Sequence, residues 1–218
     1  MDGRVPRSYR SPKREADASE TRARVLDAAA ELFAARGYAA TTMKAVAERA
    51  GVSVPTVHLQ GAKHALLVAA LDRAFAGDEG EQLLTDRPEL TAVMAEADVD
   101  TAFERYLAFL AEANERSAPL VAALSTAARV DPEAQAAYER LEERRWQDMA
   151  VGARWFATRG LLDDGDVPTA TDLLGHVLAP ETYLHFTVAR GWDASRYVRW
   201  VGHQLRTLRE QVAAVEGS

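Results

Sequence analysis

The stretch Thr41–Leu67, TTMKAVAERAGVSVPTVHLQGAKHALL, contains the signals for two short helices joined by a tight turn. Thr41 or Thr42 is placed to cap the first helix, because a threonine hydroxyl accepts a hydrogen bond from a free N–H of the first turn. Gly51 ends this helix, since glycine adopts the left-handed conformation without steric cost. Ser53 caps the second helix in the same way as the threonine caps the first.

The spacing within this stretch is that of a helix-turn-helix. Ala47 is small where the two helices would cross, and Gly51 follows at the turn. Pro55 lies in the first turn of the second helix, where its missing N–H does no harm. Three valines fill the small core between the helices: Val46, Val52 and Val57. In such a unit the second helix enters the DNA major groove. The alternative is an ordinary helical hairpin inside an all-α protein.

Residues near the amino ends of these helices are the candidate DNA contacts. Lys44 and Lys63 lie beside the second helix, where each is suited to neutralise a phosphate. Polar side chains of the second helix hydrogen-bond to base edges, and its apolar side chains contact thymine methyl groups. The predicted DNA-binding residues are Thr42, Lys44, Ser53, Val54, Pro55, Thr56, His58, Leu59, Gln60 and Lys63.

The flanking residues complete a pattern that is typical of a known family. A helix ending in Leu-Phe comes first, Arg-Gly-Tyr follows, and a lysine opens the helix after the unit: Leu32, Phe33, Arg36, Gly37, Tyr38 and Lys63. Over residues 21–75 this order resembles the tetracycline-repressor-like (TetR family) transcription regulators. The remaining chain resembles the family in length, helical pattern and the segments 180–183 and 190–192. The resemblance implies a homodimer that binds a palindromic operator in double-stranded DNA.

The end of the second helix departs from the family pattern. The family usually carries an aromatic residue there, but the run from Val57 to Lys63 has no phenylalanine and is one residue shorter. His58 stands where a tyrosine is common. The sequence therefore leaves open whether Leu59 or Gln60 faces DNA.

The charge of the chain is unevenly distributed. The 218 residues have a formal net charge of −7. Residues 1–73 hold 12 Lys and Arg against 8 Asp and Glu, which gives +4, and residues 74–218 hold 14 against 25, which gives −11. A basic amino-terminal part attracts phosphates, whereas the acidic remainder repels DNA. This asymmetry favours a DNA-binding head on a body with another role.

Helical periodicity without any useful stretch of alternation predicts an all-α fold. We expect a disordered basic arm over 1–18, a DNA-binding domain over 19–61 opened by a Ser19 cap, a connecting helix over 62–77, and an effector-binding and dimerisation domain over 78–218. In the last, helices are expected over 88–96, from Asp98 or Asp100, from Pro119, over 132–159, over 168–190 with a kink at Pro180, and over 194–213.

Aromatic and aliphatic residues at helical spacing in the middle of the chain suit either a plain core or the wall of a cavity for a small hydrophobic effector. Tyr106 would offer a polar group to such a ligand. The candidate pocket residues are Phe103, Tyr106, Leu107, Leu110, Leu124, Trp146, Met149 and Phe156.

The last two predicted helices carry apolar stripes near heptad spacing. Two such helices either cover the core of one subunit or pair with their copies as a four-helix bundle, and the family resemblance implies the pairing. The candidate dimer-interface residues are Leu173, Val177, Leu184, Tyr197, Trp200, Val201, Leu205 and Leu208.

Several kinds of chemistry have no support in the sequence. There is no cysteine, no glycine-rich phosphate loop with a following Lys-Ser/Thr, and no His-Glu-x-x-His. We expect no cofactor, no metal, no membrane association and a cytoplasmic location. A ligand-responsive repressor is the leading hypothesis. The alternatives are a helical-bundle enzyme or small-molecule-binding protein with a helix-turn-helix-like head, and a regulator controlled by a protein partner.

Overall fold

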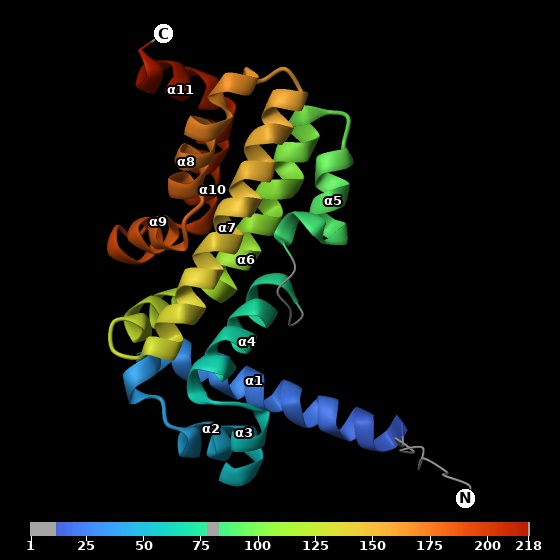
Figure 1. The fold of residues 1–218 in the computed structure, drawn as a ribbon, viewed down its shortest axis with the longest axis vertical. Helices are drawn as coiled ribbons and strands as arrows, with labels where there is room; N and C mark the ends of the chain where they lie inside the picture. Colours follow the sequence, from blue (N-terminus) through green and yellow to red (C-terminus); the bar gives the residue numbers. More distant parts are fainter. Residues whose placement is uncertain (1–11, 78–82, 218) are drawn as a thin grey trace, which may run out of the picture.

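The computed structural model describes residues 12–77 and 83–217. These residues form helices joined by short turns and contain no β-strand, so the predicted all-α fold is confirmed. Figure 1 shows an elongated molecule with a small amino-terminal head at one end of a longer helical body. No helix within the described ranges is both long enough and apolar enough to cross a membrane.

The head consists of α1 (Pro12–Ala40), α2 (Met43–Ala50) and α3 (Val54–Gln60). The Thr42 hydroxyl accepts a hydrogen bond from the Ala45 N–H at 3.1 Å, which identifies Thr42 as the cap of α2. Gly51 ends α2 at φ 67°, in the left-handed region. The Ser53 hydroxyl accepts from the Thr56 N–H at 3.2 Å and caps α3. The predicted helix-turn-helix is present with its predicted boundaries.

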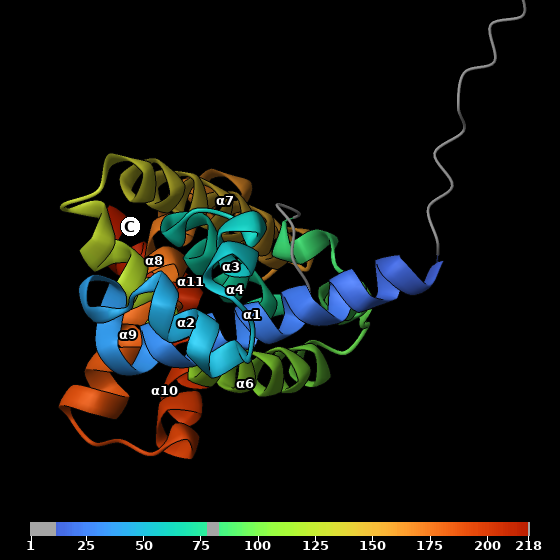
Figure 2. The ribbon, with the colours of Figure 1, turned by 90° about the horizontal axis from the view of Figure 1, so that it is seen from below.

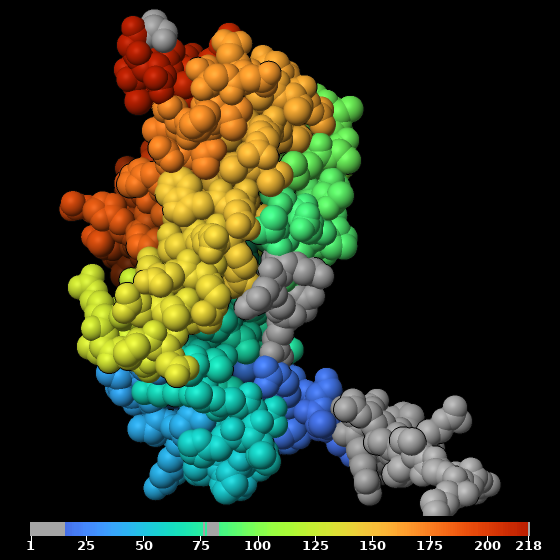
Figure 3. Space-filling view, viewed as in Figure 1, coloured from blue at the N-terminus to red at the C-terminus, as the bar shows by residue number. Residues whose placement is uncertain are grey.

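The head shares its hydrophobic core with the body. The connecting helix α4 (Lys63–Ala76) packs against α1 and against α6 (Val99–Ala128). Buried residues from the carboxyl end of α6, such as Leu120 and Leu124, join Phe33 and Val57 of the head in one cluster, the head core. The amino-terminal half of α7 (Pro132–Thr158) completes this core, and Figure 3 shows that half lying directly on the head.

The body is built around the long antiparallel pair α6 and α7. Helices from the carboxyl part of the chain cover one side of this pair, and α5 covers the other (Figure 1). The remaining elements are η1 (Leu84–Asp86), α5 (Pro88–Ala95), α8 (Val167–Val177), α9 (Pro180–Leu184), a π-helical turn (His185–Ala189), α10 (Ala194–Arg206) and α11 (Leu208–Glu216). Their buried side chains form a second cluster, the body core, which includes Phe103, Met149, Tyr197 and Val201.

Some predicted helix boundaries are wrong. The first helix begins at Pro12 rather than near Ser19, so only residues 1–11 of the predicted disordered arm remain, and these lie outside the described residues. Gly37, at φ 73° and ψ 177°, interrupts the helical conformation of α1 with a kink, at the Arg-Gly-Tyr segment that follows the predicted first helix. Pro119 lies inside α6 rather than opening a helix, and α6 continues past it to Ala128.

The last two predicted helices are also divided further than expected. A break at Leu178 and Ala179 separates α8 from α9, so Pro180 begins a helix where a kink was expected. Thr207 separates α10 from α11.

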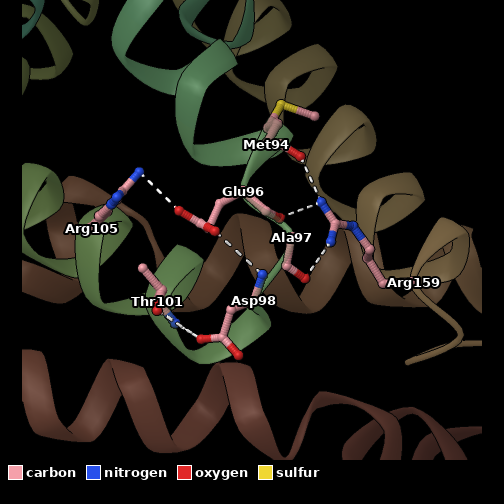
Figure 4. A network of polar contacts seen from close by, with 7 residues as sticks. All are labelled: Met94, Glu96, Ala97, Asp98, Thr101, Arg105 and Arg159. Atoms are coloured by element: carbon pink, nitrogen blue, oxygen red, sulfur yellow. Dashed lines mark hydrogen bonds and ion pairs between the residues drawn. The ribbon is translucent and has the colours of Figure 1, made fainter.

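Arg159, at the end of α7, holds the carboxyl end of α5 in place (Figure 4). Its guanidinium donates hydrogen bonds to the carbonyl oxygens of Met94 at 2.9 Å, Ala97 at 3.0 Å and Glu96. The indole N–H of Trp155 donates to the same Met94 oxygen at 2.9 Å. These bonds satisfy carbonyl groups that the end of a helix leaves without partners, and they fix α5 against α7.

Trp146 packs on Gly175 where α7 crosses α8. A β-carbon added at Gly175 would lie 2.5 Å from Cη2 and 2.6 Å from Cζ3 of Trp146. The same contact is supported by Arg145, which donates to the Gly175 carbonyl at 2.8 Å. The close approach of the two helices therefore requires a glycine at this position.

We expect Gly175→Ala to lower the free energy of unfolding by ~1–3 kcal/mol, because the added methyl group overpacks the contact with Trp146. Thermal and urea unfolding followed by circular dichroism would measure the loss. Gly152→Ala is the matched control, since a β-carbon there lies 3.9 Å from its nearest neighbour, Leu174. The control should be neutral or stabilising, because alanine favours a helix over glycine. Equal losses in the two variants would contradict this account of Gly175.

Candidate DNA interface and ligand cavity

The outer face of α3 is the exposed surface of the helix-turn-helix. Val57 is fully buried and anchors α3 in the head core, whereas Ser53, Pro55 and His58 are exposed. Val54 and Thr56 are half-buried at the start of the same helix. Figure 2, seen from the head end, shows α2 and α3 in front of the body helices. A helix presented in this way is accessible to a DNA groove.

Leu59 and Gln60 take different positions at the end of α3. Leu59 is 85 % exposed and projects from the surface. Gln60 is half-buried, and its backbone carbonyl accepts a hydrogen bond from Nη1 of Arg22 at 3.0 Å. The same guanidinium nitrogen lies 3.5 Å from the Gln60 side-chain oxygen. Arg22 thus ties the last turn of α3 to α1, and Leu59 is the residue left facing outward.

Two of the predicted contact residues already have roles in capping. Ser53 and Thr42 each accept a backbone N–H, as described above. The hydroxyl oxygens of Ser53 and Thr56 also lie 2.7 Å apart and form a hydrogen bond. A hydroxyl can cap a helix and still accept or donate elsewhere, so these residues remain suited to phosphate contacts.

The two candidate phosphate-binding lysines differ in their surroundings. Lys44 is highly exposed, with its ammonium group 3.8 Å from Glu48 one turn later. Lys63 is half-buried at the first position of α4, and its ammonium nitrogen lies 4.2 Å from the centre of the Tyr38 ring. Burial lowers the pKa of Lys63, while the negative charge of Asp131 acts in the opposite direction. The Tyr38 ring attracts this cation and restricts its position.

Tyr38 also connects the head to the amino end of α7. Its hydroxyl donates a hydrogen bond to Oδ2 of Asp131 at 2.6 Å. Asp131 caps α7 by accepting from the N–H groups of Glu133 and Ala134. The bond from Tyr38, followed by the backbone bonds, lowers the pKa of Asp131. The sequence signalled the cap at Asp131 but not this contact with the head, because the two residues are far apart in the chain.

Two adjoining cavities lie in the body. The first, about 110 Å³ and partly open, is lined by residues of α4, α6, α7 and the segment around η1. The second, about 90 Å³, lies between α5, α6, α7 and α8. They share the side chains of Tyr106 and Met149, among others. One cavity therefore lies beside the connecting helix α4, and the other adjoins it within the body.

Five of the eight predicted pocket residues line these cavities: Phe103, Tyr106, Leu110, Met149 and Phe156. The other three lie elsewhere. Leu124 is fully buried in the head core, Trp146 packs on Gly175, and Leu107 lies close to Gly202 of α10. Periodicity identified apolar helix faces correctly, but these faces serve two separate cores as well as the cavities.

Polar residues in the cavity wall were not predicted. Asn114 and Ser117 of α6 line the first cavity and are 1 % and 0 % exposed. Asp148 of α7 accepts hydrogen bonds from the N–H groups of Leu84 and Thr85 at 3.1 and 3.0 Å, and so holds η1 against α7. Asn114 and Ser117 interrupt the apolar stripe of α6, and this interruption was the signal in the sequence for a polar cavity wall.

Most of the predicted dimer-interface side chains already have contacts within the single chain. Within one protomer, five of its eight side chains are already buried in the body core: Val177, Tyr197, Val201, Leu205 and Leu208. Side chains that are covered by their own protomer are not available to a partner. Leu173, Leu184 and Trp200 remain partly exposed. Val188, on the π-helical turn nearby, is 75 % exposed.

Comparisons with known proteins agree with this architecture. Residues 25–70 match the sequence pattern described as "Bacterial regulatory proteins, tetR family". A comparison with curated protein sequences finds no significant match. Among solved structures, a chain from Syntrophomonas wolfei, provisionally described as a TetR-family transcriptional regulator, superposes with a TM-score of 0.67 at 16 % identity, covering 88 % of this chain and 95 % of that one.

A second solved structure, from Mesorhizobium loti and provisionally described in the same terms, has a TM-score of 0.65 at 22 % identity. The superposition covers 91 % of this chain and 97 % of that one. Residues 25–70 are therefore similar to the TetR family of bacterial regulatory proteins, and the described chain has the fold of these two solved structures.

Proposed function

We propose that this protein is a transcription regulator that binds operator DNA through α3 as a homodimer and is released by a small molecule bound in the body. The observation that carries the proposal is the exposed face of α3 within a TetR-like helix-turn-helix, with Lys44 in the helix before it and Lys63 in the helix after it. The basic head and acidic body described above favour the same orientation on DNA.

Dimerisation is part of the proposal because a single head contacts only a few base pairs. Two heads reading a palindrome need half-sites about 34–36 Å apart, or a multiple of that distance. Phe186, Trp192 and Trp200 form a half-buried aromatic cluster. The ring centre of Phe186 lies 4.3 Å from that of Trp192 and 4.7 Å from that of Trp200. Together with Val188, this cluster is the apolar surface that we assign to the dimer.

The coupling between ligand and DNA is proposed to pass through α4. Asp72 of α4 and Arg144 of α7 form an ion pair at 3.5 Å, and both line the first cavity. A ligand that displaces this pair would move α4 and thus the spacing of the heads. The ligand shifts DNA affinity only if it binds the two arrangements with different affinity, and a tenfold change needs ~1.4 kcal/mol of coupling.

We expect Lys63→Ala to weaken binding to every duplex and to reduce the slope of log K against log salt by about 1, because one phosphate contact is lost. Fluorescence anisotropy with an arbitrary duplex at several salt concentrations measures the slope. Arg154→Ala is the control, since Arg154 is an exposed cation in the body and should leave the slope unchanged. An unchanged slope for Lys63→Ala would remove Lys63 from the interface, and no binding by the unmodified protein would overturn the proposed function.

A further inference from the structure

Asn114 has an unpaired amide donor and lies in the wall of the first cavity. Its side chain is 1 % exposed, and its amide nitrogen Nδ2 is buried without a hydrogen-bond partner among the described residues. Buried polar groups are nearly always hydrogen-bonded, because an unsatisfied donor costs free energy. Asn114 lines the first cavity, so an acceptor atom placed against its side chain would complete the hydrogen bonding of a donor that is already desolvated.

The charged groups of this wall compensate one another. Three carboxylates and three guanidinium groups line the first cavity: Asp72, Glu142, Asp148, Arg87, Arg144 and Arg145. Asp72 pairs with Arg144, and Glu142 forms two bonds of 3.2 Å with Arg145. Asp148 is satisfied by the η1 segment, and Arg87 is also engaged in interactions. A charged ligand would have to break one of these pairs or be buried without a partner, and both are costly.

The rest of the space is apolar and divided into two lobes. Leu110 and Val121 line the first cavity, Phe103 and Phe156 line the second, and Tyr106 and Met149 belong to both. Burial raises the pKa of Tyr106, so its phenol is uncharged at neutral pH. Because a dry apolar cavity of about 150 Å³ holds one benzene molecule, cavities of about 110 and 90 Å³ that adjoin suit a two-ring body.

We propose, resting on the proposed function as a ligand-responsive regulator, that the effector is an uncharged, mostly apolar molecule of two-ring size with a carbonyl-type oxygen. The ring system occupies the adjoining lobes around Tyr106 and Met149. The oxygen accepts a hydrogen bond from Nδ2 of Asn114.

The test uses four naphthalene probes of nearly equal size: 2-acetylnaphthalene, 2-ethylnaphthalene, 2-naphthoate and 2-naphthylmethylammonium. Binding to the full chain without DNA is measured by titration calorimetry. The ketone should bind about tenfold more tightly than the hydrocarbon, which corresponds to ~1.4 kcal/mol. Both ionic probes should bind more weakly than the ketone. An ionic probe that binds most tightly, or failure of all four to bind, would overturn the proposal.

Asn114→Leu is the decisive variant, because leucine keeps the branching and the number of heavy atoms of the side chain and removes the donor. The preference for ketone over hydrocarbon should disappear or reverse in this variant, and a preserved preference would contradict the role of Asn114. Replacement of an unpaired buried amide by an apolar group is compatible with folding, which circular dichroism would verify. Gln135→Leu, which removes an exposed amide at the start of α7, is the matched control and should keep the preference.

A separate measurement distinguishes this inference from the proposed function. Release of an operator selected from random duplexes is followed with and without 2-acetylnaphthalene. Tight binding of the ketone with unchanged DNA affinity would support the cavity chemistry and contradict ligand control of DNA binding. Intact DNA binding by a protein that binds none of the probes would overturn the inference alone.

Discussion

Replacement of Val201 by glutamate should unfold the body rather than separate two folded subunits. Val201 is 0 % exposed in the body core, so the new carboxylate would be buried without a partner. An uncompensated buried polar or charged group costs several kcal/mol, a large part of the ~5–15 kcal/mol by which a domain is stable. We expect the cooperative thermal transition of Val201→Glu to be lost or strongly lowered, as measured by circular dichroism and calorimetry.

Val188→Glu is the counterpart on the surface. Val188 is 75 % exposed beside the aromatic cluster assigned to the dimer, so glutamate there should leave the melting temperature of the protomer fold nearly unchanged. It should shift the protein from dimer to monomer in light scattering at matched concentration. A folded monomer from Val201→Glu, together with an unaffected dimer from Val188→Glu, would contradict both placements.

The head could be predicted because its determinants are local. Thr42, Gly51 and Ser53 act on helix ends within three or four residues of their own positions, and each has the role that its residue type favours. The contacts of Tyr38 with Asp131 and of Arg22 with Gln60 join residues far apart in sequence, so no local pattern revealed them. The sequence showed that the end of α3 lacks the aromatic residue of the family pattern. It did not show that Gln60 would bond to Arg22 and that Leu59 would be exposed.

The body was predicted less well because periodicity identifies an apolar face without saying what covers it. The stripe containing Tyr197, Val201 and Leu205 is equally compatible with the core of one protomer and with a dimer interface, and the structure places it in the core. Leu124 and Phe103 belong to the same helix, yet they lie in different cores because α6 is long enough to reach both. Pro119 led to the wrong prediction of a helix start. A proline inside a helix is costly, but α6 continues through Pro119 and is packed on both sides of it.

The end of α3 provides the prediction with the largest expected effect on DNA binding. Leu59→Glu places a carboxylate on an 85 % exposed position of the helix that we propose enters the groove. On DNA, the new carboxylate would meet the negative potential of the phosphates, and an apolar contact would be lost. Affinity for operator and for arbitrary duplex should fall by about a hundredfold, near the upper end of the ~1–3 kcal/mol that one recognition contact contributes. Stability should be unchanged, because no buried contact is altered.

Gln60→Glu is the matched control, since it adds the same charge one residue later. The Gln60 side-chain oxygen lies 3.5 Å from the Arg22 guanidinium, so a carboxylate at this position is paired with a cation and directed toward α1. We expect its effect on DNA affinity to be at least tenfold smaller than that of Leu59→Glu, with anisotropy measured on the same duplexes at the same salt concentration. If the two losses are equal, general repulsion explains both. If Gln60→Glu is the more damaging, then Gln60 rather than Leu59 faces the groove, and the orientation of the recognition helix proposed above is wrong.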